Sequence, residues 1–511
     1  MPQPYLTGSK LILGTIALSL VNFMVILDLT IANVSLPTIA GSLAVSSSQG
    51  TWVITSYAVA EAIVVPLTGW LAQRFGAVRM LVACVGLFTL SSLLCGLSGS
   101  LGMLVFMRVI QGVSGGPVMP LSQTLLLAAY PREKTGKAMM LWALTTLLAP
   151  ILGPILGGLI SENLSWHWIF YINVPVGVLC AVLVWTLFHK RETETRRIPV
   201  DFVGLALLIA SVGCFQIVLD KGKELDWFGS NVIVALTSIS VVGFILFLVW
   251  ELTEKNPIVD LSLFKDRNFA VSVSSIALFY GIMLGSLVLI PLWLQTQMGY
   301  TSEQSGFATA PQGMGALLSA IVVGRLSGKY DPRIMVSIGT VVLIVAFLMR
   351  STFTTDVTMR MVMLPQFIQG LGTPMMFLPI MTMSLAGIPQ NKVANAAGLQ
   401  NFLRSTAGAF GASITSTLWE HSTIQHRADL VSHVSNGGFA TDTWRSTLEA
   451  QGFPPPAITA LLSRTVDGQA VMLATNEIFR SAALLFLLVP ALIWIARPKK
   501  TPGSQAQAAV H

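Results

Sequence analysis

The sequence is poor in charge. Of its 511 residues only 10% are Asp, Glu, Lys or Arg, whereas 53% are hydrophobic and the mean hydropathy is +0.73. A soluble protein of this length carries roughly 25% charged residues. The deficit therefore indicates that lipid is the main solvent of the chain, and the formal net charge of +7 does not by itself imply a nucleic-acid partner.

Cysteine is scarce, and motifs for cofactor binding and catalysis are missing. The four cysteines all fall within apolar runs, which predicts neither a disulfide framework nor a metal site. No HExxH, GxSxG or DxxxD arrangement lies on a soluble domain, and GRLSGK (324–329) has three residues between its glycines where a phosphate-binding loop requires four. We therefore expect no metal, no bound cofactor, no ATP hydrolysis and no enzyme activity.

What the sequence does contain is a series of long apolar runs. They are continuous rather than alternating, which favours membrane-spanning helices over an outer-membrane barrel. A run of about 20 apolar residues is long enough to cross a bilayer. The runs predict an all-α integral membrane protein with fourteen spans: 11–34, 50–72, 79–98, 102–126, 138–160, 168–188, 202–219, 231–250, 269–291, 304–324, 334–351, 360–385, 392–419 and 474–496.

The basic residues orient these spans. If the N-terminus is cytoplasmic, the inside segments carry 20 Lys and Arg and the outside segments carry 8. Cytoplasmic loops are enriched in basic residues. The asymmetry, together with the even number of spans, predicts that both termini are cytoplasmic.

A weak internal repeat suggests the domain organisation. MRVIQGVSGGPVMPLS (107–122) resembles LPQFIQGLGTPMMFLPIMT (364–382), and internal duplication is common in secondary transporters. We predict a six-helix bundle over 1–188, then 189–268 with cytoplasmic linkers and two inserted spans, and a second six-helix bundle over 269–511. The last part includes a long polar external loop at 420–473.

Four charged residues lie well inside predicted spans: Asp28, Glu61, Arg108 and Arg404. Each costs roughly 2.5–3.5 kcal/mol there, so such residues usually face a cavity or a partner. Asp28 and Arg108 each lie six residues from the outer end of a span, or roughly 9 Å deep. We expect them to line one cavity together with Glu61. A purely structural pairing between helices is the alternative.

Acids in such a cavity can exchange protons. Burial raises the pKa of a carboxyl group and a nearby arginine lowers it, so a change in hydration can load or release a proton. Proton and substrate would then compete for Asp28 or Glu61, and two acids would favour cationic, lipophilic substrates. The sequence does not decide which acid carries the proton.

The fifth span combines glycine with proline. In APILGPILGGL (149–159), Gly153, Gly157 and Gly158 allow close approach of another helix, and Pro154 bends the span. Ordinary helix packing would explain the glycines alone. Glycines that alternate with prolines are a more specific pattern than ordinary helix packing requires.

These stretches resemble the major facilitator superfamily, and within it the fourteen-span drug/proton antiporters of the EmrB/QacA type, most of all the EmrB branch. LDLTIANVSLP (27–37) is similar to the first-span motif, with Asp28 as its acid and Asn33 as a further candidate. RVIQG (108–112) is similar to the fourth-span motif, with Arg108 as its arginine. The run from Ala149 to Gly158 resembles the antiporter motif.

The resemblance extends to a cytoplasmic loop. GWLAQRFGAVR (69–79) is similar to the family's gating loop, and its matching residues are Gly69, Arg74, Gly76 and Arg79. The family usually has an aspartate where this chain has Gln73, so a gating salt bridge is not expected at that position.

The resemblance implies a major facilitator fold and export of lipophilic, possibly cationic, small molecules driven by the proton gradient. It also implies location in a bacterial inner membrane, with an EmrA-type periplasmic adaptor and an outer-membrane channel as partners. Segment 420–473 would be a docking surface for them. Two other functions stay open: a specific exporter of one metabolite or fatty acid, and a membrane sensor that transports nothing.

Overall fold

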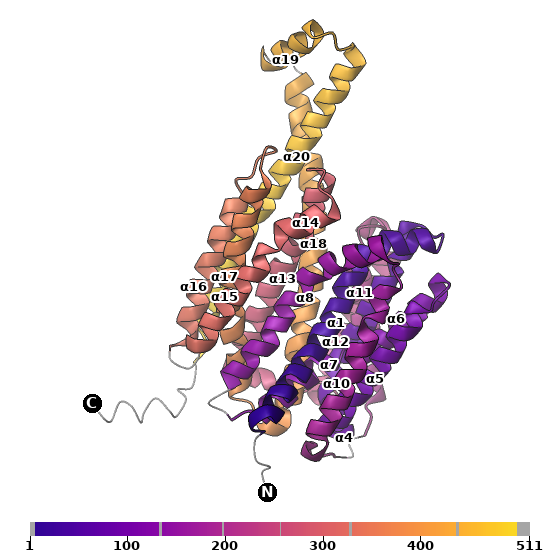
Figure 1. Cartoon of the computed structure of the whole chain (residues 1–511), viewed down its shortest axis with the longest axis vertical. Helices are drawn as coiled ribbons and strands as arrows, with labels where there is room; N and C mark the ends of the chain where they lie inside the picture. Colours follow the sequence, from indigo (N-terminus) through magenta and orange to yellow (C-terminus); the bar gives the residue numbers. More distant parts are fainter. Residues whose placement is uncertain are drawn as a thin grey trace, which may run out of the picture.

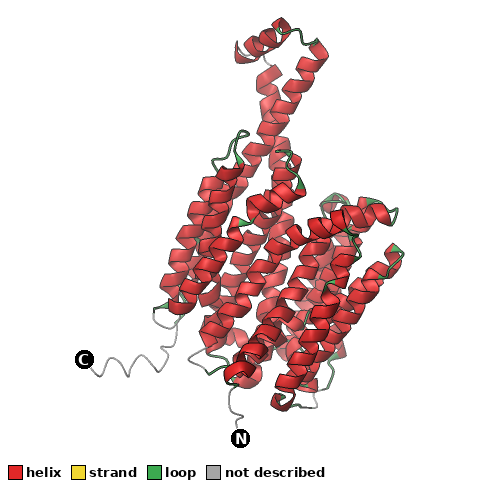
Figure 2. Ribbon diagram, viewed as in Figure 1, coloured by secondary structure: helices red, strands yellow, loops and turns green. Residues whose placement is uncertain are grey.

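The computed structural model describes residues 6–131, 135–196, 199–255, 257–326, 330–435 and 439–497. Within these ranges the secondary structure is helical, without strands (Figure 2). The helices form two groups that stand side by side, and the beginning of α1 lies at the same end of the bundle as the end of the described chain (Figure 1).

The N-terminal group consists of six helical units, several of them broken by proline or glycine. Pro66 lies in the 3₁₀ turn between α3 and α4, and Pro117 lies between α6 and α7, where a missing N–H interrupts the helix. The units are α1 (Gly8–Ser42), α3 (Trp52–Val64) with α4 (Thr68–Phe75), α5 (Ala77–Gly96), α6 (Leu101–Gly115) with α7 (Val118–Ala129), α8 (Thr135–Asn163), and α9 (Trp168–Tyr171) with α10 (Asn173–Phe188).

Two further helices, α11 (Phe202–Lys221) and α12 (Asn231–Thr253), follow. α11 packs against α3 of the first group and α18 of the second, where the Ser413 hydroxyl donates to the Leu219 carbonyl at 2.8 Å. The outward side chains of α12 are mainly valine, isoleucine, leucine and phenylalanine. A surface of this kind is suited to lipid contact.

The C-terminal group repeats the arrangement. Aspartates in short polar linkers cap two of its helices. The carboxylates of Asp266 and Asp331 accept hydrogen bonds from backbone N–H groups at the beginning of α13 and α16. Its helices are α13 (Arg267–Thr296), α14 (Ser302–Thr309) with α15 (Pro311–Leu326), α16 (Pro332–Arg350), α17 (Met359–Ala386), α18 (Val393–Ser435), α19 (Phe439–Ala450) and α20 (Pro455–Phe486) with α21 (Leu488–Ile493).

Twelve helical segments of the described chain are long and apolar enough to cross a membrane, and α8 makes thirteen if its two parts, which meet at 44°, form one span. α18 fails this test of composition but packs along α13 and α20 inside the bundle. Its polar residues find partners there, since Asn401 donates to Gln123 Oε1 at 3.1 Å and Gln400 Oε1 accepts from Ser384 at 2.7 Å.

Segment 420–473, expected as a polar external loop, is mostly helical. α18 continues to Ser435, α19 covers 439–450, and α20 begins at Pro455. The three helices form a hairpin that projects beyond the rest of the bundle (Figure 1). Polar contacts join its two arms: Arg427 forms an ion pair with Asp467 at 2.5 Å, and His426 lies 3.2 Å from Glu477.

Candidate transport site

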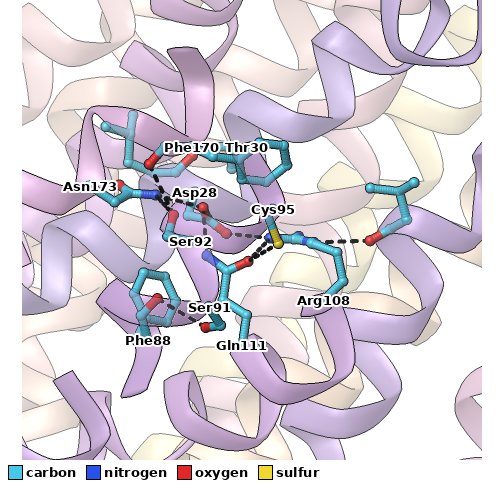
Figure 3. Close-up of polar contacts among 12 residues, drawn as sticks. Asp28, Thr30, Phe88, Ser91, Ser92, Cys95, Arg108, Gln111, Phe170 and Asn173 are labelled. Atoms are coloured by element: carbon cyan, nitrogen blue, oxygen red, sulfur yellow. Dashed lines mark hydrogen bonds and ion pairs between the residues drawn. The ribbon is translucent and has the colours of Figure 1, made fainter. Parts of the chain in front are cut away.

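Asp28 lies at the centre of a polar cluster inside the N-terminal group (Figure 3). Its Oδ2 is 2.5 Å from Nη1 of Arg108, and its Oδ1 accepts hydrogen bonds from Gln111 Nε2 at 3.0 Å and Asn173 Nδ2 at 2.7 Å. Asn173 also donates to Ser92 Oγ at 3.0 Å. Three helices, α1, α6 and α10, therefore meet at one carboxylate, and α5 joins the cluster through Ser92.

Arg108 is held from several sides. Nη1 also donates to Gln111 Oε1 at 2.8 Å, Nε donates to the Val53 carbonyl at 3.0 Å, and the guanidinium lies 4.2 Å from the centre of the Tyr57 ring. The side chains of Asp28 and Arg108 are both 0% exposed. They form a closed ion pair, the structural alternative considered above, and their lining of a cavity stays a prediction.

α1 is longer than the predicted span: it continues past residue 34, through Pro37, and ends at Ser42, fourteen residues or roughly 21 Å after Asp28. The depth of Asp28 in the membrane stays a prediction. Asn33, five residues after Asp28, is exposed and takes no part in the cluster.

Glu61 differs from Asp28 in its surroundings. It lies on α3 and is partly buried, and within the described chain it makes no hydrogen bond and no ion pair. The charged side chains near enough to act on it are those of Arg404, Arg108 and Asp28. Glu61 is therefore an acid without a fixed partner, close to a cation from the other group of helices.

Arg404 lies on α18, where the two groups of helices meet. Its Nη2 is 2.9 Å from the Met119 sulfur, and its guanidinium is 4.8 Å from the centre of the Tyr280 ring. Among the described residues Nε and Nη1 find no hydrogen-bond partner, although Arg404 is only 3% exposed. Arg404 is thus a buried cation that is only partly satisfied by its neighbours.

The glycines of α8 allow close contact with α1. A Cβ on Gly153 would lie 2.1 Å from Thr30 Oγ1, and one on Gly157 would lie 3.0 Å from the Ile31 carbonyl oxygen. Gly158 has open space, and Ala149 is fully buried. α8 also packs against α14 and α15. The Ala149–Gly158 stretch, with Pro154 in it, therefore lies where the two groups meet.

The predicted gating loop also joins the two groups. A Cβ on Gly69 would lie 2.5 Å from Cα of Asn395 at the beginning of α18. Gln73 Nε2 donates to Asn395 Oδ1 at 2.9 Å. At the position where the family usually has an aspartate, this chain thus has Gln73, which forms a hydrogen bond between two neutral side chains.

The rest of this loop is organised by Glu192. Its carboxylate accepts from the backbone N–H groups of Val78 and Arg79, both at 2.9 Å, at the beginning of α5. Gly76 has φ +92° and would place a Cβ 2.4 Å from this carboxylate, so glycine is required there. Arg74 stacks on Trp70, 5.3 Å from the ring centre.

The sequence interpretation missed three polar residues. Gln111 and Asn173, both buried partners of Asp28, are amides inside apolar runs, a signal that a search for charges alone overlooks. Arg350 was assigned to an external segment, yet it is 0% exposed. Among the described residues no three His, Cys, Asp or Glu side chains come together as a metal site would require.

Comparison with known proteins identifies the family. Residues 18–412 match the model of the Major Facilitator Superfamily. The chain is 46% identical over 496 residues to the multidrug export protein EmrB of Haemophilus influenzae, covering 97% of each chain. It is 43% identical over 498 residues to the fatty acid resistance protein FarB of Neisseria gonorrhoeae, covering 98% of each.

A solved structure agrees at the level of the fold. The proton:xylose symporter XylE aligns with a TM-score of 0.60 and 14% identity over 95% of each chain. With its many apolar helices and these relatives, the chain is a multi-pass protein of the bacterial inner membrane. It belongs to the major facilitator superfamily, and within it to the EmrB branch.

Proposed function

We propose that the chain is a proton-driven multidrug exporter in which Glu61 carries the proton. The observation that carries the assignment is the contrast between the two acids. Asp28 is engaged by one arginine and two amides, whereas Glu61 has no hydrogen bond within the described chain and lies near Arg404 of the other group of helices.

The proposed coupling depends on the separation of Glu61 and Arg404. The proton affinity of a carboxyl group changes with the distance to a neighbouring cation and with access to water. Alternating access in this kind of transporter is a rocking of one group of helices against the other. Such a motion changes the distance between a residue of α3 and a residue of α18, and so couples proton binding to the state of the transporter.

The same proposal includes fourteen spans with cytoplasmic termini. Twelve helices satisfy the composition test, α8 adds one, and α18 adds another because its polar side chains are paired inside the bundle. In this orientation the α18–α20 hairpin projects into the periplasm. We propose it as the docking surface for a periplasmic adaptor that continues to an outer-membrane channel.

Efflux of ethidium from cells, with and without a collapsed proton gradient, tests the function. Glu61→Gln should abolish gradient-dependent efflux at normal expression. The matched control Glu194→Gln removes an exposed acid of the linker after α10 and should leave efflux unchanged. Full efflux by Glu61→Gln would contradict the role of this acid.

A specific exporter is the second candidate, because one close relative is named for fatty acid resistance. A panel of chemically diverse compounds separates the two. Resistance to one compound class alone would favour the specific exporter, and no substrate-evoked proton movement in proteoliposomes would instead favour a sensor.

A further inference from the structure

Two acids, Asp201 and Glu251, approach each other where α11 begins and α12 ends. Asp201 immediately precedes α11, and Glu251 lies two residues before the end of α12. A Cβ on Gly204 would lie 2.3 Å from Asp201 Oδ2 and 2.8 Å from Glu251 Oε1. The two oxygen atoms therefore face the same point of α11, and the two carboxyl groups are close neighbours.

Both oxygens of Asp201 accept hydrogen bonds. Oδ1 accepts from the backbone N–H group of Gly204 at 2.9 Å and so caps α11. Oδ2 accepts from Trp250 Nε1 at 2.8 Å. Because an N–H group can only donate, these contacts are the ones that an ionised carboxylate makes.

Glu251 is satisfied at only one of its two oxygens. Oε2 accepts from the backbone N–H group of Val259 at 3.1 Å, whereas Oε1 finds no hydrogen-bond partner among the described residues. Glu251 is 4% exposed, so bulk water has little access to this oxygen. A buried polar atom without a partner is costly. The oxygen without a partner is the one that faces Asp201.

The charged groups around Glu251 do not neutralise it. Those that act on it are Asp201 of α11 and Glu254 of the linker that follows α12, and both are acids. Lys255 of this linker is exposed, and Lys392, immediately before α18, pairs with a different acid of the linker at 2.8 Å. Two ionised carboxylates that share one buried site repel each other, so such a pair retains a proton.

We propose that Asp201 and Glu251 hold one proton between them, carried by Glu251 Oε1, and that this proton fixes the linker after α12. With the proton, Glu251 donates towards the ionised Asp201, while Oε2 keeps the N–H group of Val259. Without the proton, two negative charges face each other and push the carboxyl groups apart. The proton site is distinct from Glu61 and does not depend on the export function.

The linker that Glu251 holds contacts both groups of helices. Val259 is 5% exposed and belongs to one apolar cluster with Val65, before α4, and Phe269, in α13. The next residue, Asp260, pairs with Lys392 at 2.8 Å. Loss of the proton would therefore loosen the linker where the inserted helices join the two groups. In the proposed orientation this end of the bundle exchanges protons with the cytoplasm.

The pH dependence of unfolding tests the shared proton. In the unfolded chain a glutamate releases its proton above about pH 5. Folding therefore takes up a proton at neutral pH, and the free energy of unfolding falls as the pH rises. Glu251→Gln places an NH₂ group at the protonated oxygen and keeps an acceptor for Val259. We expect it to lower the proton uptake on folding by about one.

Unfolding of the full chain by sodium dodecyl sulfate in mixed micelles, from mildly acidic to mildly alkaline pH, provides the uptake as the slope of the free energy against pH. Glu194→Gln removes an exposed acid of the linker after α10 and should leave the slope unchanged. If Glu251→Gln does not fold, Asp201→Asn removes the opposing charge at the partly exposed start of α11 and should also lower the uptake.

Two results would overturn the shared proton. The first is an unchanged proton uptake in whichever of the variants Glu251→Gln and Asp201→Asn folds. The second is a stabilisation by magnesium ions at constant pH that occurs in the unmodified chain and is lost in Glu251→Gln, because it would assign the pair to a metal cation instead.

The release of the linker has a separate test. Val259→Cys is labelled with a maleimide, alone and together with Glu251→Gln, and the unmodified chain corrects for the native cysteines. Because thiol reactivity itself rises with pH, the ratio of the two rates is the measure. We expect equal rates at mildly acidic pH and a several-fold faster rate for Val259→Cys alone at mildly alkaline pH. Equal rates at both would overturn the release.

Discussion

Removal of either charge of the ion pair between Asp28 and Arg108 should destabilise the fold by a similar amount. Both side chains are 0% exposed, and the carboxylate accepts hydrogen bonds from Arg108, Gln111 and Asn173. Breaking a buried pair by removing one partner costs about 3–5 kcal/mol, because the remaining charge stays buried and unpaired. We expect Asp28→Asn and Arg108→Gln each to lower the free energy of unfolding by about 3 kcal/mol or more.

The double variant should recover much of this loss. It leaves no buried charge at this site, and its two new amides can still hydrogen-bond to Gln111 and Asn173. The coupling energy from the four proteins of the cycle should therefore be at least about 2 kcal/mol. Unfolding by sodium dodecyl sulfate in mixed micelles, followed by tryptophan fluorescence, provides the four free energies.

An exposed ion pair of the same chain is the control. Arg427 and Asp467 are 2.5 Å apart across the hairpin, with side chains 52% and 47% exposed. Exposed pairs contribute less than about 1 kcal/mol. If the coupling energy of Asp28 and Arg108 were as small as that of the control pair, the reasoning that they form a desolvated unit would be refuted.

Three further predictions concern contacts between helices and linkers. Gly153→Val should lower the free energy of unfolding by about 1–3 kcal/mol, since its Cβ would meet a hydroxyl oxygen of α1 at 2.1 Å; Gly158→Val, with nothing within 4 Å, should not, and equal losses would contradict this. Gly69→Ala should slow ethidium efflux at normal expression, because its Cβ meets backbone of α18 at 2.5 Å; full efflux would show that this contact is dispensable. Burial raises the pKa of Asp260, but hydrogen bonds from Lys392 and a serine hydroxyl lower it more, so the pKa lies below its usual value. The ionised form thus stabilises the fold above about pH 4, and this contribution is lost as the pH falls through the folded-state pKa. Asp260→Asn should lower the melting temperature at pH 7, and the difference should shrink as the pH falls through the folded-state pKa; a difference that does not shrink in acid would contradict the linkage.

Sequence patterns anticipated the helices better than the contacts between them. Apolar runs located the helices because a span must be apolar where it faces lipid. The beginning of α18 was also located, although this helix is more polar than the others. Its extension to Ser435 could not be located, since residues 420–435 are polar and carry no comparable apolar signal.

The site was anticipated only in part. The charges of Asp28 and Arg108 stood out in apolar runs, but their direct pairing depends on how α1 and α6 pack. Arg350 was missed because it is the last residue of α16, where sequence alone does not separate a buried side chain from an exposed one. The hydrogen bond of Gln73 to Asn395 joins residues more than 300 positions apart and has no local signal.

The length of α18 has a mechanical consequence. Its 43 residues form one helix of roughly 65 Å that begins beside Gln73, passes Arg404 and ends in the projecting hairpin. A rigid rod of that length converts a tilt of about 10° into a displacement of roughly 11 Å at its far end. The tip of the hairpin would therefore move when the bundle opens or closes. A protein bound at this tip could respond to the movement without touching the substrate.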